Sequence, residues 1–271
     1  MIQANKTLDF STKAFFMAMV ILFILMQVAF HPSYLRFFPQ FHEFSWIHHI
    51  HGALMVSWVA ILIIQPYLII KNNFKTHRLI GKISNFTAPL VFISMILITK
   101  LNYLKMVDVM PFKDAAAWQS LNIFTPFNFL IFYSLANIYK KDVFKHKRYM
   151  IGTAFTILGA ISSRLLIIIF GPSLEFNAFF ISEYFGISIV LLLLLNDVRK
   201  KVSPIPYTIV AVGLCINIIS IHARYTNEWQ SVVRFIVDNF FLKELKLLRI
   251  SKPERILLIP RTKKPNAQQR I

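Results

Sequence analysis

Residues 46–70 read WIHHIHGALMVSWVAILIIQPYLII, a stretch of 25 residues that contains no Lys, Arg, Asp or Glu. A helix of this length is long enough to cross the roughly 30 Å hydrocarbon core of a bilayer at about 1.5 Å per residue. Six further blocks of about 17–25 mostly apolar residues occur along the chain. The sequence therefore predicts an all-α, polytopic membrane helix bundle of about seven transmembrane helices, with spans over residues 14–30, 46–70, 83–99, 119–138, 149–170, 177–196 and 204–223.

The composition agrees with this class. Of 271 residues, 56% are hydrophobic and 15% are charged, whereas soluble domains contain about 25% charged residues. Cys215 is the only cysteine, so an intramolecular disulfide, a Cys-x-x-Cys redox pair and an iron–sulfur site are all excluded. Any metal or cofactor must then be held by His, Met, Tyr or carboxylate side chains.

The net charge of +18 is concentrated in short loops between apolar blocks. No basic stripe interleaved with aromatic residues is present, so the charge indicates a lipid bilayer as partner and no nucleic acid. Fourteen Lys or Arg fall on one predicted face of the membrane and four on the other, which predicts a cytoplasmic N-terminus. The fourteen lie in the N-terminal segment and in loops 71–82, 139–148 and 197–203.

The C-terminal part has a different pattern. We predict three regions: a transmembrane bundle over residues 1–223, an amphipathic interfacial helix over 224–241 and a basic tail over 242–271. In the second region Trp229 and its apolar neighbours share one helical face, which is typical of a helix lying on the membrane. The tail carries nine Lys or Arg. Seven spans would leave it outside, so either the span count differs by one or the tail binds anionic headgroups.

Polar side chains within the spans are costly in hydrocarbon, so they are the candidate functional residues. In the second span His51, Trp58 and Gln65 are spaced seven residues apart and stack on one helical face. His48 lies one turn before His51 on that face. We predict that this polar ridge of His48, His51, Trp58 and Gln65 faces the interior of the bundle.

Four further residues complete the candidate set. His77 and His146 open the third and fifth spans at the cytoplasmic side, and Arg164 lies on the same helical face as His146, near its far end. Glu183 is the only carboxylate well inside an apolar block, and the Gly171-Pro172 turn predicts that it comes within reach of Arg164. An arginine inside a span indicates an essential ion pair or a functional role.

The motifs His51-Gly52, His77-Arg-x-x-Gly-Lys82 and His146-x-Arg-Tyr-Met150, followed by Arg164, resemble a known group. That group comprises uncharacterised bacterial multi-pass membrane proteins, classed as a domain of unknown function and reminiscent of transmembrane b-type cytochromes. The resemblance covers about residues 46–170 and implies the bacterial inner membrane. Lys82 and Tyr149 stand where the group has Arg and often Trp. A four-ligand di-haem site would need a histidine in the fourth span, where Gln119 and Asn122 stand.

The leading functional hypothesis is a membrane redox protein that binds haem b and passes electrons to a partner. His48, His51, His77, His146 and Arg164 are its candidate cofactor-binding residues. Neutral imidazoles from facing helices are the usual axial ligands of such haems, and an arginine can neutralise a propionate. His77 and His146 are the predicted iron ligands, facing each other across a slot that is lined by Gly81, Ser84 and Thr153.

Three other functions remain open at this stage, and whether the chain is an enzyme is undecided. A small-solute or ion transporter could use an Arg164–Glu183 pair, although no paired half-helices mark a midplane site. A zinc hydrolase would need Glu43 or Glu183 as its base beside the outer histidines. A structural or assembly protein needs no cofactor, and His77 and His146 would then be interfacial residues at helix ends.

Overall fold

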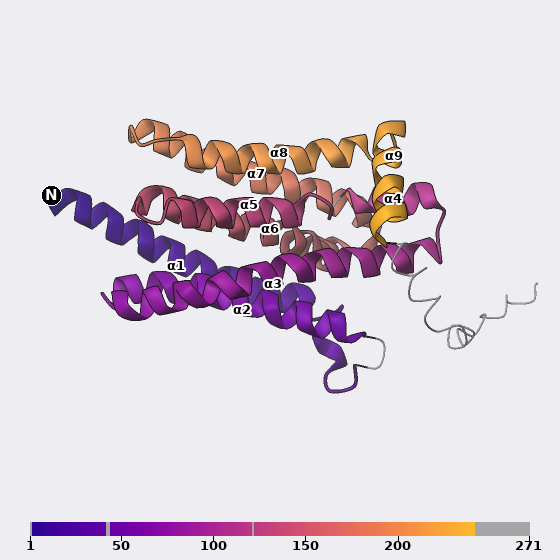
Figure 1. The fold of residues 1–271 in the computed structure, drawn as a ribbon, viewed down its shortest axis with the longest axis horizontal. Helices are drawn as coiled ribbons and strands as arrows, with labels where there is room; N and C mark the ends of the chain where they lie inside the picture. The colour runs from indigo at the N-terminus through magenta and orange to yellow at the C-terminus, as the bar shows by residue number, and fades with distance from the viewer. Residues whose placement is uncertain (1, 42–43, 121, 242–271) are drawn as a thin grey trace, which may run out of the picture. The chain divides into compact units, whose positions relative to one another are not determined.

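The computed structural model describes residues 2–41, 44–120 and 122–241, with side chains described from residue 11 onward except that of Glu175. It is built from helices, and no β-strand occurs in that part of the chain. Figure 1 shows their order: α1 (Ile2–Phe30), α2 (Trp46–Ile70), α3 (Phe74–Val107), α4 (Phe112–Gln119), α5 (Thr125–Ile138), α6 (Val143–Phe170), α7 (Glu175–Arg199), α8 (Ile205–Ala223) and α9 (Asn227–Ile236). Short 3₁₀ turns at Leu35–Phe37 and Pro172–Leu174 and a π-helical turn at Val237–Phe241 complete the structure.

The chain separates into two compact units, residues 1–230 and 231–271, and the boundary falls within α9. The first unit contains every candidate functional residue. Of the second, only residues 231–241 are described. The basic tail predicted over 242–271 lies outside the described residues.

The predicted class is confirmed, since six of the described helices are long and apolar enough to cross a membrane. The predicted fourth span, 119–138, is the exception, because its helix, α5, begins only at Thr125, and α4 before it ends at Gln119. Helix α5 has 14 residues, about 21 Å at 1.5 Å per residue, which is less than the hydrocarbon thickness. The irregular backbone between the two helices is tolerated at this depth only if protein covers it. Buried Ser120, whose carbonyl accepts a hydrogen bond from the Ser220 hydroxyl at 2.9 Å, meets this condition.

Local chemistry explains where the long helices begin and end. The Asn73 carboxamide oxygen accepts a hydrogen bond from the Thr76 amide at the start of α3, and Asp142 accepts one from the Lys145 amide at the start of α6. The hydrogen bond from the Lys145 amide holds the pKa of the Asp142 carboxyl below its usual range. Gly171 ends α6 at a φ of +91°, a backbone conformation that side chains with a Cβ rarely adopt.

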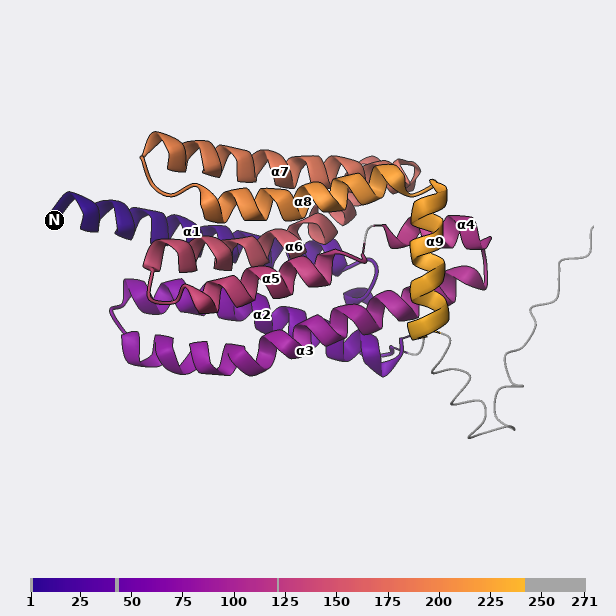
Figure 2. The same cartoon turned by 45° about the horizontal axis from the view of Figure 1, so that its top comes forward.

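Five helices enclose the main core. Helix α1 packs on α2, α2 on α3, α3 on α5, α5 on α6, and α6 again on α1 (Figures 1 and 2). Within this five-helix ring, Trp58 of α2 is fully buried and packs edge-on against Phe129 and Tyr133 of α5. Helices α7 and α8 pack on α6, and α8 also packs on α5. Helix α6 therefore belongs to both the ring and the α7–α8 side of the molecule.

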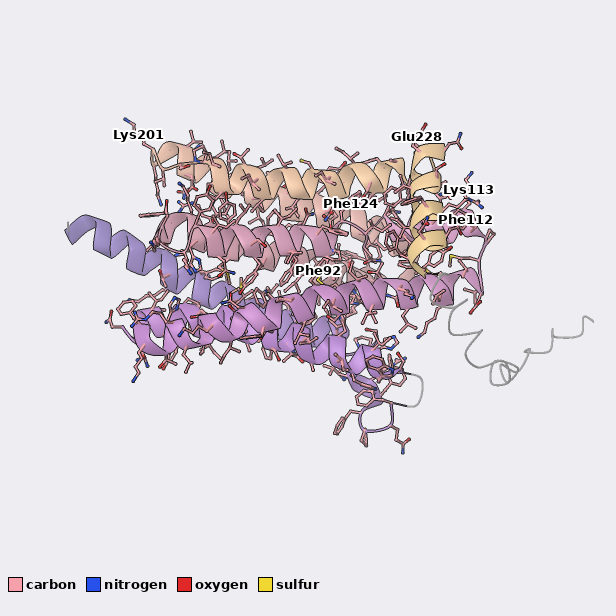
Figure 3. All side chains as sticks on the ribbon, viewed as in Figure 1. Phe92, Phe112, Lys113, Phe124, Lys201 and Glu228 are labelled. Atoms are coloured by element: carbon pink, nitrogen blue, oxygen red, sulfur yellow. The ribbon has the colours of Figure 1, made fainter. Side chains whose placement is uncertain are left out.

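The loops alternate between two ends of the first unit. The N-terminus and the α2–α3, α5–α6 and α7–α8 connections lie at one end (Figures 1 and 2). Lys201, in the α7–α8 connection, and Lys113 of α4 lie at opposite ends (Figure 3). The basic loops used for the orientation prediction thus share one end of the bundle. Between the ends, large apolar side chains such as Phe86 and Ile219 are exposed, as expected for a surface covered by lipid.

The predicted interfacial helix differs from the structure at Trp229. This side chain is buried, and its indole Nε1 donates a hydrogen bond to the Ala116 carbonyl oxygen of α4 at 2.9 Å. Trp229 therefore packs on protein, and the placement of residues 224–241 on the membrane surface stays a prediction. A helical-face pattern distinguishes apolar from polar sides, but it does not distinguish burial in lipid from burial in protein.

Candidate functional site

The polar ridge of α2 lies inside the bundle, as predicted. His51 Nδ1 is 3.0 Å from the Ser94 hydroxyl of α3, Gln65 Nε2 donates to the His77 carbonyl oxygen at 3.2 Å, and Trp58 is fully buried. The Ser94 hydroxyl also donates to the Val91 carbonyl oxygen at 2.8 Å. Its proton is thereby used, so we assign the proton between His51 and Ser94 to His51 Nδ1. His51 Nε2 is then the unprotonated nitrogen, which can accept a hydrogen bond or bind a metal ion.

Arg164 lies beside this histidine, close enough for its charge to act on His51. Its Nη1 donates to the Ala160 carbonyl oxygen at 2.9 Å, and its guanidinium carbon lies 4.3 Å from the centre of the Phe30 ring. Within the described residues it forms no ion pair with a carboxylate. The ion pair expected between Arg164 and Glu183 is therefore wrong: Arg164 turns towards α1, whereas Glu183 contacts Gly159 of α6.

Some polar atoms of the bundle are buried without partners. Four side-chain atoms in the described part of the chain have this property, and three of them belong to residues of α2 and α3. They are Trp58 Nε1, Gln65 Oε1 and His77 Nδ1, and the fourth is Gln119 Oε1. Buried polar atoms without partners are rare in native proteins, and each one is a candidate for contact with a ligand, an ion or water.

His146 is held in one orientation. Its Nδ1 is 2.8 Å from the Ala136 carbonyl oxygen near the C-terminal end of α5. A carbonyl oxygen only accepts, so Nδ1 carries the proton and Nε2 is free to bind an electrophile. Asp142 caps the first turn of α6 and accepts the His146 backbone amide at its carbonyl oxygen, 2.9 Å away. His77 and His146 are close enough to interact electrostatically.

The slot predicted between α3 and α6, lined by Gly81, Ser84 and Thr153, is not found in the described chain, so this prediction is wrong. Helix α5 packs against both α3 and α6, and these two helices have no extensive contact with each other. At the expected slot residues, a Cβ on Gly81 would meet Gln65 Nε2 at 3.7 Å, and Ser84 shares a 2.9 Å hydrogen bond with Tyr133 of α5. Thr153 donates to the Met150 carbonyl oxygen of its own helix at 2.7 Å.

The other histidines have structural partners. His48 caps the start of α2, because its Nδ1 accepts a hydrogen bond from the Ser45 backbone amide at 3.2 Å. This role accounts for His48 without a cofactor. His49 Nδ1 is 2.5 Å from the Tyr34 hydroxyl, and His222 Nε2 is 2.8 Å from the Tyr184 hydroxyl. His42, together with Glu43, lies outside the described residues.

The sequence interpretation missed three polar residues that the structure brings into contact with site residues or buries in ion pairs. Asn128 of α5 and Asn217 of α8 hydrogen-bond to each other at 3.2 Å, and Asp197 pairs with Arg148. Each is a polar residue within or at the end of an apolar block, which is the signal that identified Glu183. This signal was considered at Gln65 but not at Asn128, Asn217 or Asp197.

The chain matches no protein-family model, no curated protein sequence and no solved structure. Residues 2–41, 44–120 and 122–241 contain no group of three or more His, Cys, Asp or Glu arranged to hold a metal ion. A zinc hydrolase built on such a group therefore has no support in the described residues. A pair of axial imidazoles is a different requirement, since the macrocycle supplies the other ligands of haem iron.

Proposed function

We propose that the chain is an integral membrane electron-transfer protein that holds one b-type haem, with His77 and His146 as its axial ligands. The observation that carries this proposal is the His146–Ala136 hydrogen bond, because it fixes the imidazole and leaves Nε2 free. A backbone carbonyl that accepts from the second ring nitrogen is the usual support of a metal-binding histidine. The resemblance to b-type cytochromes stated from the sequence leads to the same residues.

His77, in contrast to His146, has no hydrogen-bond partner on its Nδ1 in the described chain. Its Nδ1 is buried without a partner, and so is the acceptor oxygen of Gln65, whose Nε2 already bonds to the His77 backbone. Because the Gln65 carboxamide already bonds to the His77 backbone, its oxygen is the candidate acceptor for the His77 Nδ1 proton, which would give His77 the same kind of support as His146. The two unpaired atoms therefore fit an imidazole that becomes a ligand only when the cofactor is bound.

When bound, haem would supply one-electron chemistry. The residues of the chain would orient the two imidazoles, exclude water through the buried Trp58–Phe129–Tyr133 cluster and place the cofactor at the end of the bundle that carries the basic loops. In this proposal that end faces the cytoplasm of a bacterial cell, where an electron-transfer partner would meet it. Arg164 and His51 lie towards the other end and would stabilise an anionic group there.

The test is a pyridine haemochrome spectrum of the detergent-purified protein, produced with added haem precursor. We expect a b-type spectrum with about one haem per chain, reduced at least tenfold by His146→Ala or His77→Ala. His49→Ala and His222→Ala are matched controls, since both remove a part-exposed histidine that is hydrogen-bonded to tyrosine. A folded, monodisperse wild-type protein without bound haem, also after reconstitution with hemin, would rule out the proposal.

The second candidate is a small-solute or ion transporter. The observation that favours it is the break between α4 and α5, which places irregular backbone and the buried Gln119 within the bundle. Broken helices at membrane depth are typical of transporter sites. A haem-free protein that exchanges a solute across vesicles would support this reading. A protein with neither property would support a structural or assembly role.

A further inference from the structure

Glu183 lies inside α7, about 12 Å from the start of the helix at 1.5 Å per residue. Its carboxyl faces α6 at Gly159, and a Cβ placed on Gly159 would lie only 2.6 Å from Glu183 Oε1. Any larger residue at position 159 would therefore displace the carboxyl. The absence of a side chain there makes room for an acid within the membrane domain.

A chain of amides leads from this carboxyl to α5. Asn217 of α8 hydrogen-bonds to Glu183, and its Oδ1 accepts from Asn128 Nδ2 at 3.2 Å. Asn128 Nδ2 also donates to the Gly213 carbonyl oxygen at 2.9 Å. Because Asn217 Oδ1 is already an acceptor, its NH₂ group is the donor to Glu183. Asn128 and Asn217 are both buried, so four helices meet at one polar junction.

No described cation neutralises the carboxyl. On α6, Arg164 turns to the Phe30 ring and Arg148 pairs with Asp197 at the far end of the helix. Of the other basic groups of α6, Lys147 donates to the Ser11 hydroxyl of α1 at 2.9 Å, Lys145 pairs with Asp142, and His146 bonds to the Ala136 carbonyl oxygen. Each charged side chain of α6 therefore contacts a group other than the Glu183 carboxyl.

The basic groups of the other neighbouring helices also have other partners: Arg224, at the end of α8, has its guanidinium carbon 4.5 Å from the centre of the Phe176 ring and 5.1 Å from that of Phe180. On α8, Tyr207 lies beside Arg148, and His222 bonds to Tyr184 at the exposed surface. On α5, the titratable Tyr133 donates to Asn85 of α3 at 2.7 Å. The contacts of the Glu183 carboxyl in the described chain are therefore with neutral groups, Asn217 and the backbone at Gly159.

An ionised carboxylate without a counter-charge costs several kcal/mol in a low-dielectric interior, whereas the neutral acid keeps its hydrogen bond from Asn217. We propose that Glu183 is a proton-binding site of the membrane domain. Its carboxylate takes one proton from water to become the neutral acid and returns it on ionisation, with Asn217 donating to the carboxyl in both states. This site does not depend on haem, since no residue of the junction is a proposed iron ligand.

The experiment uses the purified full-length protein in lipid vesicles and the lipophilic reagent dicyclohexylcarbodiimide. This reagent adds to protonated carboxyls in apolar surroundings, so peptide mapping by mass spectrometry should find it on Glu183 and the labelling rate should fall as pH rises. Asp197 is the matched internal control: it is buried but ion-paired with Arg148, so it should stay unlabelled. Glu183→Gln should reduce total labelling at least tenfold.

Two results would overturn the proposal. One is a folded wild-type protein in which the Glu183 peptide is recovered unlabelled at every pH. The other is a labelling rate that does not change with pH, because the carboxyl would then exchange no proton with water. Both results come from the wild-type protein, so a variant that fails to fold leaves the test intact. Gly159→Ala adds a positional check, since displacing the carboxyl should change the labelling rate.

Discussion

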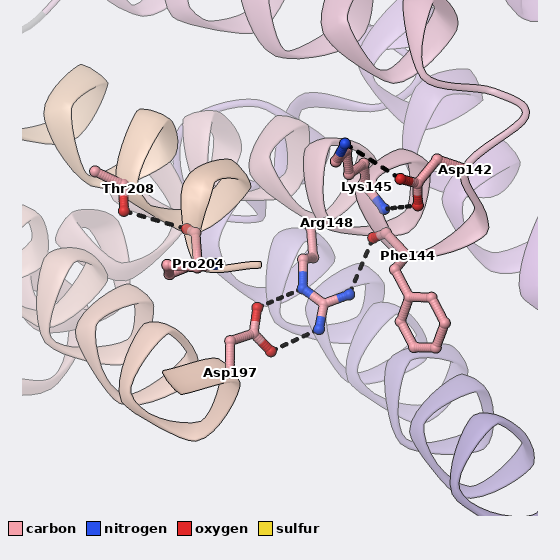
Figure 4. Close-up of polar contacts among 7 residues, drawn as sticks. All are labelled: Asp142, Phe144, Lys145, Arg148, Asp197, Pro204 and Thr208. Atoms are coloured by element: carbon pink, nitrogen blue, oxygen red, sulfur yellow. Dashed lines mark hydrogen bonds and ion pairs between the residues drawn. The ribbon is translucent and has the colours of Figure 1, made fainter. Parts of the chain in front are cut away.

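Arg148 of α6 and Asp197 of α7 form a two-point ion pair at the end of the bundle that carries the basic loops. Arg148 Nε and Nη2 each bond to one oxygen of the carboxylate, the latter at 2.6 Å, while Nη1 donates to the Phe144 carbonyl oxygen at 3.1 Å (Figure 4). Asp197 is 2% exposed, and the guanidinium also lies over the Tyr207 ring of α8. One arginine thereby connects three helices.

Breaking this pair should be costly. Asp197→Ala leaves the guanidinium half-buried without its counter-charge, and we expect it to lower the free energy of unfolding by about 3–5 kcal/mol. The measurement is a reversible SDS titration of the detergent-purified protein, followed by circular dichroism. Arg148→Lys should lose part of this stability, because an ammonium cannot bond to both carboxylate oxygens in the planar geometry.

The control for this prediction is Asp142→Ala. It removes an acid that is more exposed and whose ion pair, with Lys145 at 3.3 Å, joins neighbouring turns of one helix. We expect a smaller loss there, from the helix cap alone. Equal losses in the two variants would mean that the Arg148–Asp197 pair contributes no more than a surface interaction.

The orientation in the membrane gives a second prediction. The N-terminus and three basic loops share one end of the bundle, so the fourteen positive charges counted in the sequence lie on one side. Reporter fusions at Asn73 and Lys145 should score as cytoplasmic, and a fusion at Lys113 should score as external. Active alkaline phosphatase at Asn73 or Lys145 would reverse the orientation and the side assigned to every histidine.

Much of the architecture could be predicted from the sequence because hydrocarbon imposes simple requirements. Apolar length predicted the helices, and seven-residue spacing predicted that His51 and Gln65 share an inward face, since helical geometry alone determines both. The break between α4 and α5 was not predictable in this way. A hydropathy window averages over about twenty residues, and the partner of the buried Ser120 carbonyl oxygen, the Ser220 hydroxyl, lies 100 residues away in the sequence.

The prediction of an Arg164–Glu183 ion pair failed for a related reason. Spacing placed Arg164 and Glu183 on adjacent helices, but the rotation of each helix about its axis depends on contacts with other helices. Arg164 turns to Phe30 of α1, and Glu183 turns to Gly159 and Asn217. Helices that are distant in sequence thus determine the direction of both side chains. The sequence pattern of the α6–α7 hairpin alone does not predict these directions.

A third prediction concerns Trp58. Its ring fills the core between α2 and α5, so Trp58→Ala should cost about 3–5 kcal/mol of the free energy of unfolding. Trp58→Phe keeps most of the ring and removes an Nε1 proton that has no partner. In the ligand-free protein it should therefore cost less than about 1.5 kcal/mol, measured by the same SDS titration. A loss as large as that of the alanine variant would show that the Nε1 proton has a stabilising partner.

The last prediction compares two glycines of neighbouring helices. A Cβ on Gly213 of α8 would lie 2.7 Å from Phe132 Cζ and 2.8 Å from Asn128 Oδ1, and both side chains are buried and have little room to move. Gly213→Ala should therefore destabilise the protein by about 1–3 kcal/mol through overpacking. Gly186 of α7 has no atom within 4 Å of the corresponding position, so Gly186→Ala should cause no loss and can gain about 0.5–1 kcal/mol from its helix preference. Thermal melting of both variants in the same detergent gives the comparison. If Gly213→Ala melts no lower than Gly186→Ala, the close packing of α8 against α5 at Phe132 and Asn128 is wrong.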